Sequence, residues 1–127
     1  MTKDTPPATL AACQTKPMLL AFSVAPSGIP ADPAYAKAGA DASVHDAVAA
    51  AVRVVRESGL PNQTDSMFTT IEGEWDEVFD VVKRAAEEVG KYGSRVSLVI
   101  KADIRPGYSG ELTAKVDRLE NAITGQS

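Results

Sequence analysis

The chain has 127 residues, of which 44% are hydrophobic and 24% are charged. This length fits one compact domain, and the composition is that of a globular protein, which excludes the disordered and fibrous classes. The 13 Lys and Arg residues against 17 Asp and Glu residues give a net charge of -4, and no basic run predicts binding to nucleic acid.

Reactive side chains are scarce in this chain. Cys13 is the one cysteine and His45 is the one histidine. A single cysteine cannot close an intramolecular disulfide, and His45 has no second histidine or cysteine at metal-ligand spacing. The chain also lacks a base and a nucleophile in an arrangement typical of covalent catalysis. We therefore expect a protein that holds no metal, uses no cofactor and is not an enzyme.

The beginning of the chain differs from the rest. Residues 1–17 are rich in proline and polar residues without periodicity, which predicts a flexible tail before a single domain at residues 18–127. The residues before Cys13 resemble a lipoprotein signal, but Asp4 and Pro6 stand where such a signal needs an apolar stretch. No apolar run is long enough to span a membrane, so we expect a cytoplasmic protein with no membrane partner.

The first half of the domain predicts a strand, a long loop and a helix. Residues 19–25 alternate as in a half-buried strand. A loop rich in Ala, Gly and Pro follows at residues 29–42 and is either mobile or a lid. Ser43 and Asp46 have the spacing of a capping box at a helix start, and the helix is expected to end at Gly59. Its predicted apolar stripe consists of Val44, Val48, Ala51, Val52 and Val55.

The second half predicts a hairpin, a helix, a long strand and a last helix. The helix after the hairpin is strongly amphipathic, and we expect Trp75 in the core at the start of its apolar stripe. The long strand alternates almost without fault, which is typical of a central strand with one face covered by helices. The predicted elements are the hairpin strands at residues 63–65 and 67–72, the helix at 75–89, the strand at 95–105 and the helix at 111–124.

This order of elements, β-α-β-β-α-β-α, predicts an α+β fold. It is the order of the ferredoxin-like βαββαβ sandwich with an additional C-terminal helix. Two crossover helices can cover only one face of such a sheet, so the other face is open. Because Phe68 and Val99 are expected on this open face, we predict that it is buried against another subunit.

Polar side chains gather on the same open face. Alternation places Ser23 on the first strand, Glu72 at the end of the hairpin, and Lys101 and Asp103 on the last strand. Two carboxylates and a lysine on one sheet face could hold a cation or form ion pairs across a dimer interface. The alternative is a solvated charge ladder, in which each exposed pair contributes about 0.2–1 kcal/mol.

Three segments of the chain resemble a known family. They read S-V-A-P-S-G at residues 23–28, M-F-T-T-I-E-G at residues 67–73 and I-K-A-D-I-R at residues 100–105. In this order they are similar to the S-x-x-P-x-G, M-x-T-x-I-E-G and I-K-x-D-x-R patterns of the thiamine-binding MTH1187/YkoF-like family (UPF0045). The resemblance covers residues 18–123. The chain departs from the family in its tail and in the loop at residues 29–42, which is longer and could cover a pocket or block it.

The resemblance implies a function and a set of binding residues. It implies a non-catalytic protein that binds thiamine or its hydroxymethylpyrimidine part as a carrier, buffer or sensor, and that forms a homodimer or homotetramer. Hydroxyls and carboxylates can satisfy the edges of an aminopyrimidine, and a carboxylate favours the thiazolium cation. The candidate ligand-binding residues are Ser23, Thr69, Thr70, Glu72, Lys101 and Asp103.

The six candidates do not all match the family in the same way. Thr70 lies off the motif but shares a face with Glu72, and the hydroxyl of the adjacent Thr69 points to the other side of the sheet. Lys101 could orient a carboxylate by pairing with it. The second hypothesis is an oligomeric regulatory or assembly module without a small-molecule ligand, in which the open face serves only contact between subunits.

Overall fold

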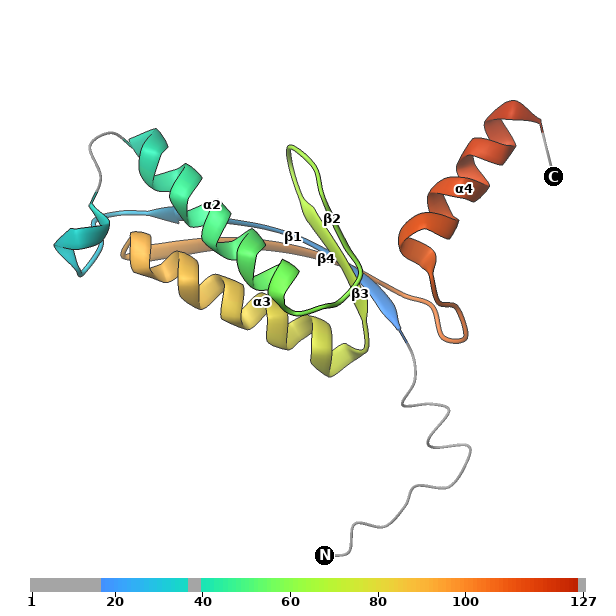
Figure 1. Ribbon diagram of the computed structural model, residues 1–127, viewed down its shortest axis with the longest axis horizontal. Coiled ribbons are helices and arrows are strands. Elements are labelled where there is room, and N and C mark those ends of the chain that lie inside the picture. The colour runs from blue at the N-terminus through green and yellow to red at the C-terminus, as the bar shows by residue number, and fades with distance from the viewer. Residues whose placement is uncertain (1–16, 37–39, 126–127) are drawn as a thin grey trace, which may run out of the picture.

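The computed structural model of the protein describes residues 17–36 and 40–125, without the side chains of residues 40–43. The strands are β1 (Met18–Ser27), β2 (Asn62–Thr64), β3 (Thr69–Gly73) and β4 (Arg95–Ile104), and the helices are α2 (Ala40–Glu57), α3 (Trp75–Val89) and α4 (Glu111–Thr124). Within the described residues the strands form one antiparallel sheet in the order β2-β3-β1-β4. α2 and α3 cover one face of this sheet, and α4 stands at one end (Figure 1).

The order of elements confirms the predicted α+β, ferredoxin-like sandwich with an additional C-terminal helix. The core lies between the sheet and the two covering helices. On β1, Met18, Leu20, Phe22 and Val24 are buried and alternate with side chains on the open face. The largest fully buried side chains are Leu20, Val55, Ile71, Val78, Val81 and Val89. None of the helices in the described part of the chain is long and apolar enough to cross a membrane.

Helix α3 has the predicted bounds, but its first residue is not in the core. The Glu77 carboxylate accepts a hydrogen bond from the Glu74 N–H at 3.0 Å, which fixes the start of the helix. Trp75 is 55% exposed, and its ring lies 5.0 Å from the ring of Phe79. The prediction that Trp75 is a core residue is therefore wrong. The buried stripe is shifted round the helix and consists of Val78, Val81, Val82, Ala85 and Val89.

Helix α2 begins earlier and faces the core differently than predicted. It starts at Ala40, so Ser43 lies inside the helix and the predicted capping box is not its start. Val48 is 39% exposed, so the predicted apolar stripe is wrong at this position. The buried stripe consists mainly of alanines, namely Ala47, Ala50 and Ala51 with Val55. Small side chains on this face let the helix lie close to its neighbours, and they leave larger valines on the outer face.

The strand predictions are right in kind and shifted at the ends. β3 begins at Thr69, two residues later than predicted, because a tight turn occupies the residues before it. In this turn the Asp65 carboxylate accepts hydrogen bonds from the N–H groups of Met67 and Phe68 at 2.8 and 2.9 Å. β4 is an edge strand and not the central strand that its alternation predicted, because β1 and β3 occupy the centre.

The described part of the long loop lies far from α4 (Figure 1). It contains a short 3-10 turn, η1 (Pro33–Tyr35), in which the Asp32 carboxylate accepts a hydrogen bond from the Ala34 N–H at 2.9 Å. Tyr35 packs edge-on against Tyr92, at 5.0 Å between ring centroids, in a second 3-10 turn, η2 (Gly90–Tyr92). η1 and α4 are at opposite ends of the molecule (Figure 1). Residues 37–39 of the predicted loop, and residues 1–16 of the predicted tail, lie outside the described residues.

Candidate functional site

The strand register brings five of the six candidate residues onto the open face. Leu19 lies between Glu72 on β3 and Asp103 on β4, and Ala21 lies between Thr70 and Lys101. Residues directly opposite each other share a face of the sheet. The backbones of the two flanking strands are two strand spacings apart, about 10 Å. Ser23, two residues further along β1 and opposite Val99, lies on the same face.

Thr69 lies on the other face of the sheet. It is opposite Phe22, a core residue, and is itself buried. Its hydroxyl oxygen lies 3.2 Å from that of Thr64, on the neighbouring strand β2. This side chain is therefore separated by the sheet from the other five candidates, and the structure gives it a contact within the hairpin.

The carboxylate of Glu72 holds the start of α4. It is 5% exposed, and its two oxygens accept hydrogen bonds from the backbone N–H groups of Glu111, at 3.0 Å, and Leu112, at 3.3 Å. The residue at the N-cap position is Gly110, which has no side chain to cap the helix. A carboxylate from β3 therefore supplies the acceptor that Ser, Thr, Asp or Asn usually provides there, and its charge suits the positive end of the helix dipole.

Asp103 is paired with α4 as well. Its carboxylate forms an ion pair with Lys115, and this hydrogen bond is the main reason why the pKa of Asp103 is lowered. The partner that orients the carboxylate is thus Lys115, whereas the sequence suggested Lys101. Lys101 is exposed, and it adds a weaker electrostatic contribution that also lowers the pKa of Asp103.

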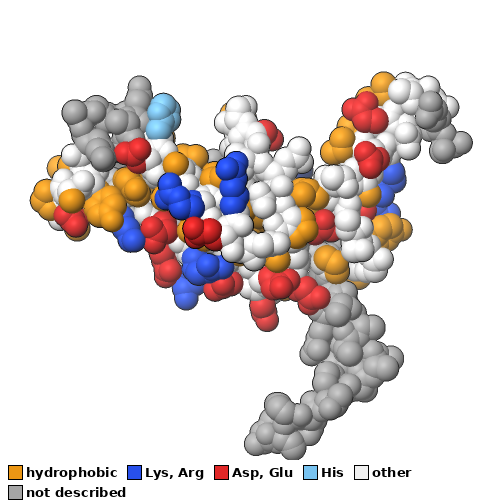
Figure 2. Space-filling model, viewed as in Figure 1, with side chains coloured by type: hydrophobic (Ala, Val, Ile, Leu, Met, Phe, Trp, Pro, Cys, Tyr) orange, Lys and Arg blue, Asp and Glu red, His pale blue; other side chains and the backbone are white. Residues whose placement is uncertain are grey.

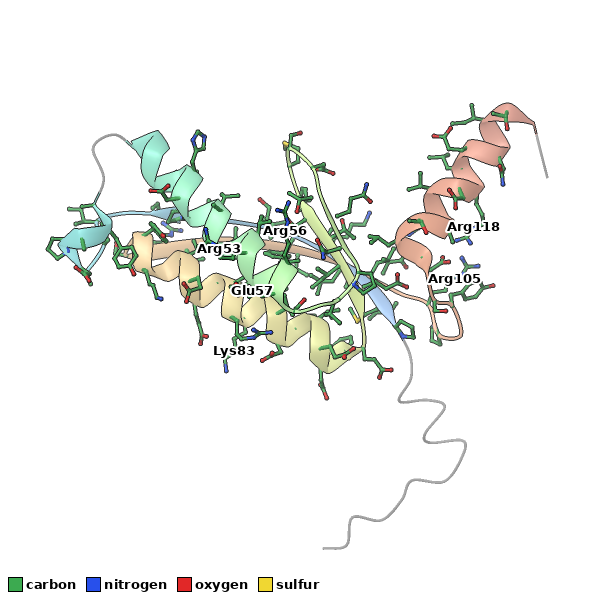
Figure 3. The ribbon with its side chains drawn as sticks, viewed as in Figure 1. Arg53, Arg56, Glu57, Lys83, Arg105 and Arg118 are labelled. Atoms are coloured by element: carbon green, nitrogen blue, oxygen red, sulfur yellow. The ribbon has the colours of Figure 1, made fainter. Side chains whose placement is uncertain are left out.

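A third carboxylate completes this polar network, and the sequence did not single it out. Glu111 is buried, and its carboxylate contacts the guanidinium of Arg118 at 2.6 Å and that of Arg105 at 3.8 Å. The hydrogen bond from Arg118 is the largest cause of the lowered pKa of Glu111. Arg105 also stacks over the Tyr108 ring, 3.7 Å from its centroid. Figure 3 shows both arginines beside the start of α4.

A groove opens between the sheet and α4. It has a volume of about 390 Å³. Its apolar walls come from β1 and from the stripe of α4, and its polar groups come from the hairpin and from α4. Of the six candidates, Thr70 lines the groove directly. Glu72 and Asp103 contribute through the α4 residues that they hold, because Glu111 and Lys115 are both in its lining. The groove is lined by Leu19, Gln63, Asp65, Thr70, Glu111, Leu112, Lys115, Val116 and Leu119.

The chemistry of this groove suits a small cationic heterocycle. Thr70 and Gln63 offer a hydroxyl and an amide, which can donate and accept hydrogen bonds at the edge of a ring. Of the charged lining residues, Glu111 is paired with arginines and Lys115 with Asp103. Asp65 is the lining carboxylate that has no ion-pair partner among the described residues, so it is the group that would favour a cation. The pKa of Asp65 is lowered, chiefly by the hydrogen bond from the Phe68 N–H. The described residues hold no group of three or more His, Cys, Asp or Glu that could bind a metal ion.

The sequence did not point to two residues of this site, Gln63 and Glu111. Gln63 faces the groove because it lies opposite Thr70 in a strand of only three residues, and the bounds of so short a strand are set by the turn beside it. Glu111 was visible only as an acidic residue in the first turn of a helix. A glycine at the N-cap, Gly110, was the one available signal that α4 takes its cap from elsewhere.

Most of this chain, including most residues of the groove, is similar in sequence to known proteins. The model of the family described as "Thiamine-binding protein" matches residues 21–120. The UPF0045 protein Mb1933 of Mycobacterium bovis is 49% identical over 107 residues, which are 84% of this chain and 94% of that protein. The UPF0045 protein sll0230 of Synechocystis is 35% identical over 83 residues, covering 65% of this chain and 69% of its own.

The fold is also found among solved structures. A domain of unknown function, DUF77, from Bacillus cereus superposes with a TM-score of 0.61 at 31% identity, over 77% of this chain and 86% of its own. Together with the family match, this similarity confirms the family that the three motifs indicated. The chain belongs to the thiamine-binding protein family, which includes the UPF0045 proteins.

Proposed function

We propose that the protein binds thiamine, or its hydroxymethylpyrimidine part, in the groove between the sheet and α4, and that it acts as a carrier, buffer or sensor without catalysing a reaction. The observation that carries this proposal is the lining of the groove, which combines apolar walls with Thr70, Gln63 and the carboxylate of Asp65. An aminopyrimidine needs donors and acceptors at its edge, and a thiazolium is a permanent cation that favours a negative surrounding.

A binding role without catalysis is supported by the use that the fold makes of the carboxylates. Glu72 accepts two backbone hydrogen bonds, Asp103 is paired with Lys115, and Glu111 contacts two arginines. A general base needs a carboxylate that is free to take a proton from the substrate. We therefore assign these three groups to holding α4 as a wall of the groove, and the polar contacts with the ligand to Thr70 and Gln63. Ser23 and Lys101 remain proposed contacts further along the open face.

Isothermal titration of the protein with thiamine, and then with hydroxymethylpyrimidine, tests this proposal. We expect saturable binding of one ligand per chain. In Thr70→Val the side chain keeps its shape but loses its hydroxyl, so we expect binding about tenfold weaker, the loss of one hydrogen bond to a ligand. The control is Thr113→Val, because Thr113 is exposed on α4 and does not line the groove. If neither ligand binds, or if both variants bind equally well, the proposed site is wrong.

The surface of the molecule favours a second role, assembly with further copies of the chain. The apolar stripe of α4 is largely uncovered, with Leu119 58% exposed. β4 is a ten-residue edge strand, and Val99 on its open face is 54% exposed. Long edge strands and uncovered apolar faces are the usual sites of association. We propose that the open face forms the contact of a homodimer or homotetramer, whether or not it also binds a ligand.

Light scattering measures this assembly. We expect the protein to have the mass of a dimer or tetramer and Val99→Lys to shift it toward the monomer, because a lysine at the centre of the contact would be desolvated without a partner. Ile29→Lys is the matched control, because Ile29 is an exposed apolar residue two positions after the last residue of β1. That end of β1 lies away from α4 (Figure 1). A monomeric wild-type protein would contradict the assembly, and equal effects of the two lysines would contradict the assignment to the open face.

A further inference from the structure

A second groove lies on the helix-covered side of the sheet, away from α4. It runs between the outer face of α2 and the β2–β3 hairpin, and its volume is about 710 Å³. One wall is apolar and comes from Val48, which is exposed, and Val52, which is half-buried. The opposite wall carries the side chains of Thr64 and Ser66 from the hairpin.

Two arginines lie over this groove. Arg53 and Arg56 are three residues apart on α2, so they project from the same side of the helix. Figure 3 shows them on the face of α2 that is turned toward the viewer, and Figure 2, in the same view, shows patches of positive charge on this side of the molecule. Within the described residues neither arginine has an ion-pair partner. Among the described residues Lys83, Arg95 and Lys101 likewise lack an ion pair, whereas Arg84, Lys91, Arg105, Lys115 and Arg118 each contact a carboxylate.

The surrounding acidic groups do not cancel this charge. Glu57 is the single carboxylate among the lining residues, against the two arginines. Asp65 is next to Ser66 in the sequence, but it lines the groove between the sheet and α4 on the other side of the hairpin and does not line this one. A protein with a net charge of -4 therefore holds a local positive site beside an apolar wall.

We infer that this groove binds a small organic phosphate. A guanidinium presents two parallel N–H groups to phosphate oxygens, which is why arginine pairs are suited to phosphoryl groups. Arg53 and Arg56 bind the phosphoryl group, the hydroxyl of Ser66 donates a further hydrogen bond, and the organic part lies against Val48 and Val52. This site is independent of the thiamine groove, because it lies on the opposite face of the sheet.

The test uses phenyl phosphate as the probe, at constant ionic strength, with backbone amide NMR shifts recorded on the full chain. We expect saturable shifts that are confined to α2 and the hairpin. Arg53→Gln should weaken the binding about tenfold, since it removes one guanidinium and the charge-assisted hydrogen bonds that it donates to the phosphoryl group. Arg53 is preferred to Arg56 because Arg56 lies in the last turn of α2, where a cation also stabilises the helix end.

The matched control is Arg84→Gln, which removes the same charge from the exposed face of α3, where Arg84 pairs with Asp80. We expect this variant to bind phenyl phosphate like the wild type, and Arg53→Gln to bind thiamine like the wild type. Equal weakening by both substitutions would mean that the probe senses only the net charge and would overturn the site. Phenol that binds as tightly as phenyl phosphate, or the absence of saturable shifts at α2 and the hairpin, would overturn it as well.

Discussion

Glu72→Ala is expected to release α4 from the sheet and to lower the free energy of unfolding by about 2 kcal/mol. The substitution removes the acceptor of two backbone N–H groups, those of Glu111 and Leu112, in a place where the glutamate side chain excludes water. Gly110 at the N-cap has no side chain that could take over. Amide hydrogen exchange should show faster exchange in the first turn of α4, while the amides of β1 and α3 stay protected.

A second variant, Glu72→Gln, distinguishes the hydrogen bonds that Glu72 accepts at the start of α4 from the effect of its negative charge. Glutamine keeps one acceptor oxygen and the shape of the side chain, so we expect it to retain part of the protection of α4 and to lose the interaction of the carboxylate with the helix dipole. Both variants should also bind thiamine more weakly, because α4 supplies one wall of the groove. If Glu72→Ala weakened thiamine binding with no change in the exchange of α4, Glu72 would be a direct ligand contact, as the sequence motif suggested, and its role in positioning the helix would be refuted.

The elements with strong periodicity were predictable from the sequence. α3 and α4 have the predicted bounds because each has an apolar stripe between polar faces and a glycine that ends it. The alternation of β1 correctly separated Leu20, Phe22 and Val24 from Ser23. The buried face of α2 was harder to predict, because alanines and valines surround most of the helix and two different apolar stripes are compatible with its sequence. Only packing against the core decided that the alanines face inward and that Val48 faces outward.

The candidate site was predictable as a face of the sheet but not as a set of contacts. Period-two alternation places Thr70 on the same face as Glu72, and Lys101 on the same face as Asp103, and this follows from the sequence. The antiparallel register that brings the two pairs to either side of β1 comes from the structure. The partners of Glu72 are 39 and 40 residues away along the chain, and Lys115 is 12 residues from Asp103. Such pairings depend on where α4 turns back toward the sheet. No local pattern encodes that turn, so the sequence did not indicate Lys115 or the start of α4 as the partners of these carboxylates.

Gly93→Ala is expected to lower the free energy of unfolding by about 1–3 kcal/mol, the usual cost of forcing an atom into a filled site. A Cβ at Gly93 would lie 2.5 Å from the carbonyl oxygen of Ser27, and backbone cannot move aside as a flexible side chain can. Urea unfolding measures the effect as a lower midpoint at an unchanged slope. Gly90→Ala is the matched control, because Gly90 has helical dihedral angles and its Cβ would make only an ordinary contact, 3.7 Å from Val96.

We expect Gly90→Ala to unfold at the same urea concentration as the wild type or slightly above it, since alanine restricts the unfolded chain more than glycine does. Equal midpoints for Gly93→Ala and the wild type would show that this close approach is not needed. The approach matters for the site because it lets β4 begin with Arg95 opposite Ser27. From that start the register runs down to Asp103 opposite Leu19. A slip of one residue would turn Lys101 and Asp103 to the other face of the sheet, so the polar side of β4 depends on a contact at the far end of the same strand.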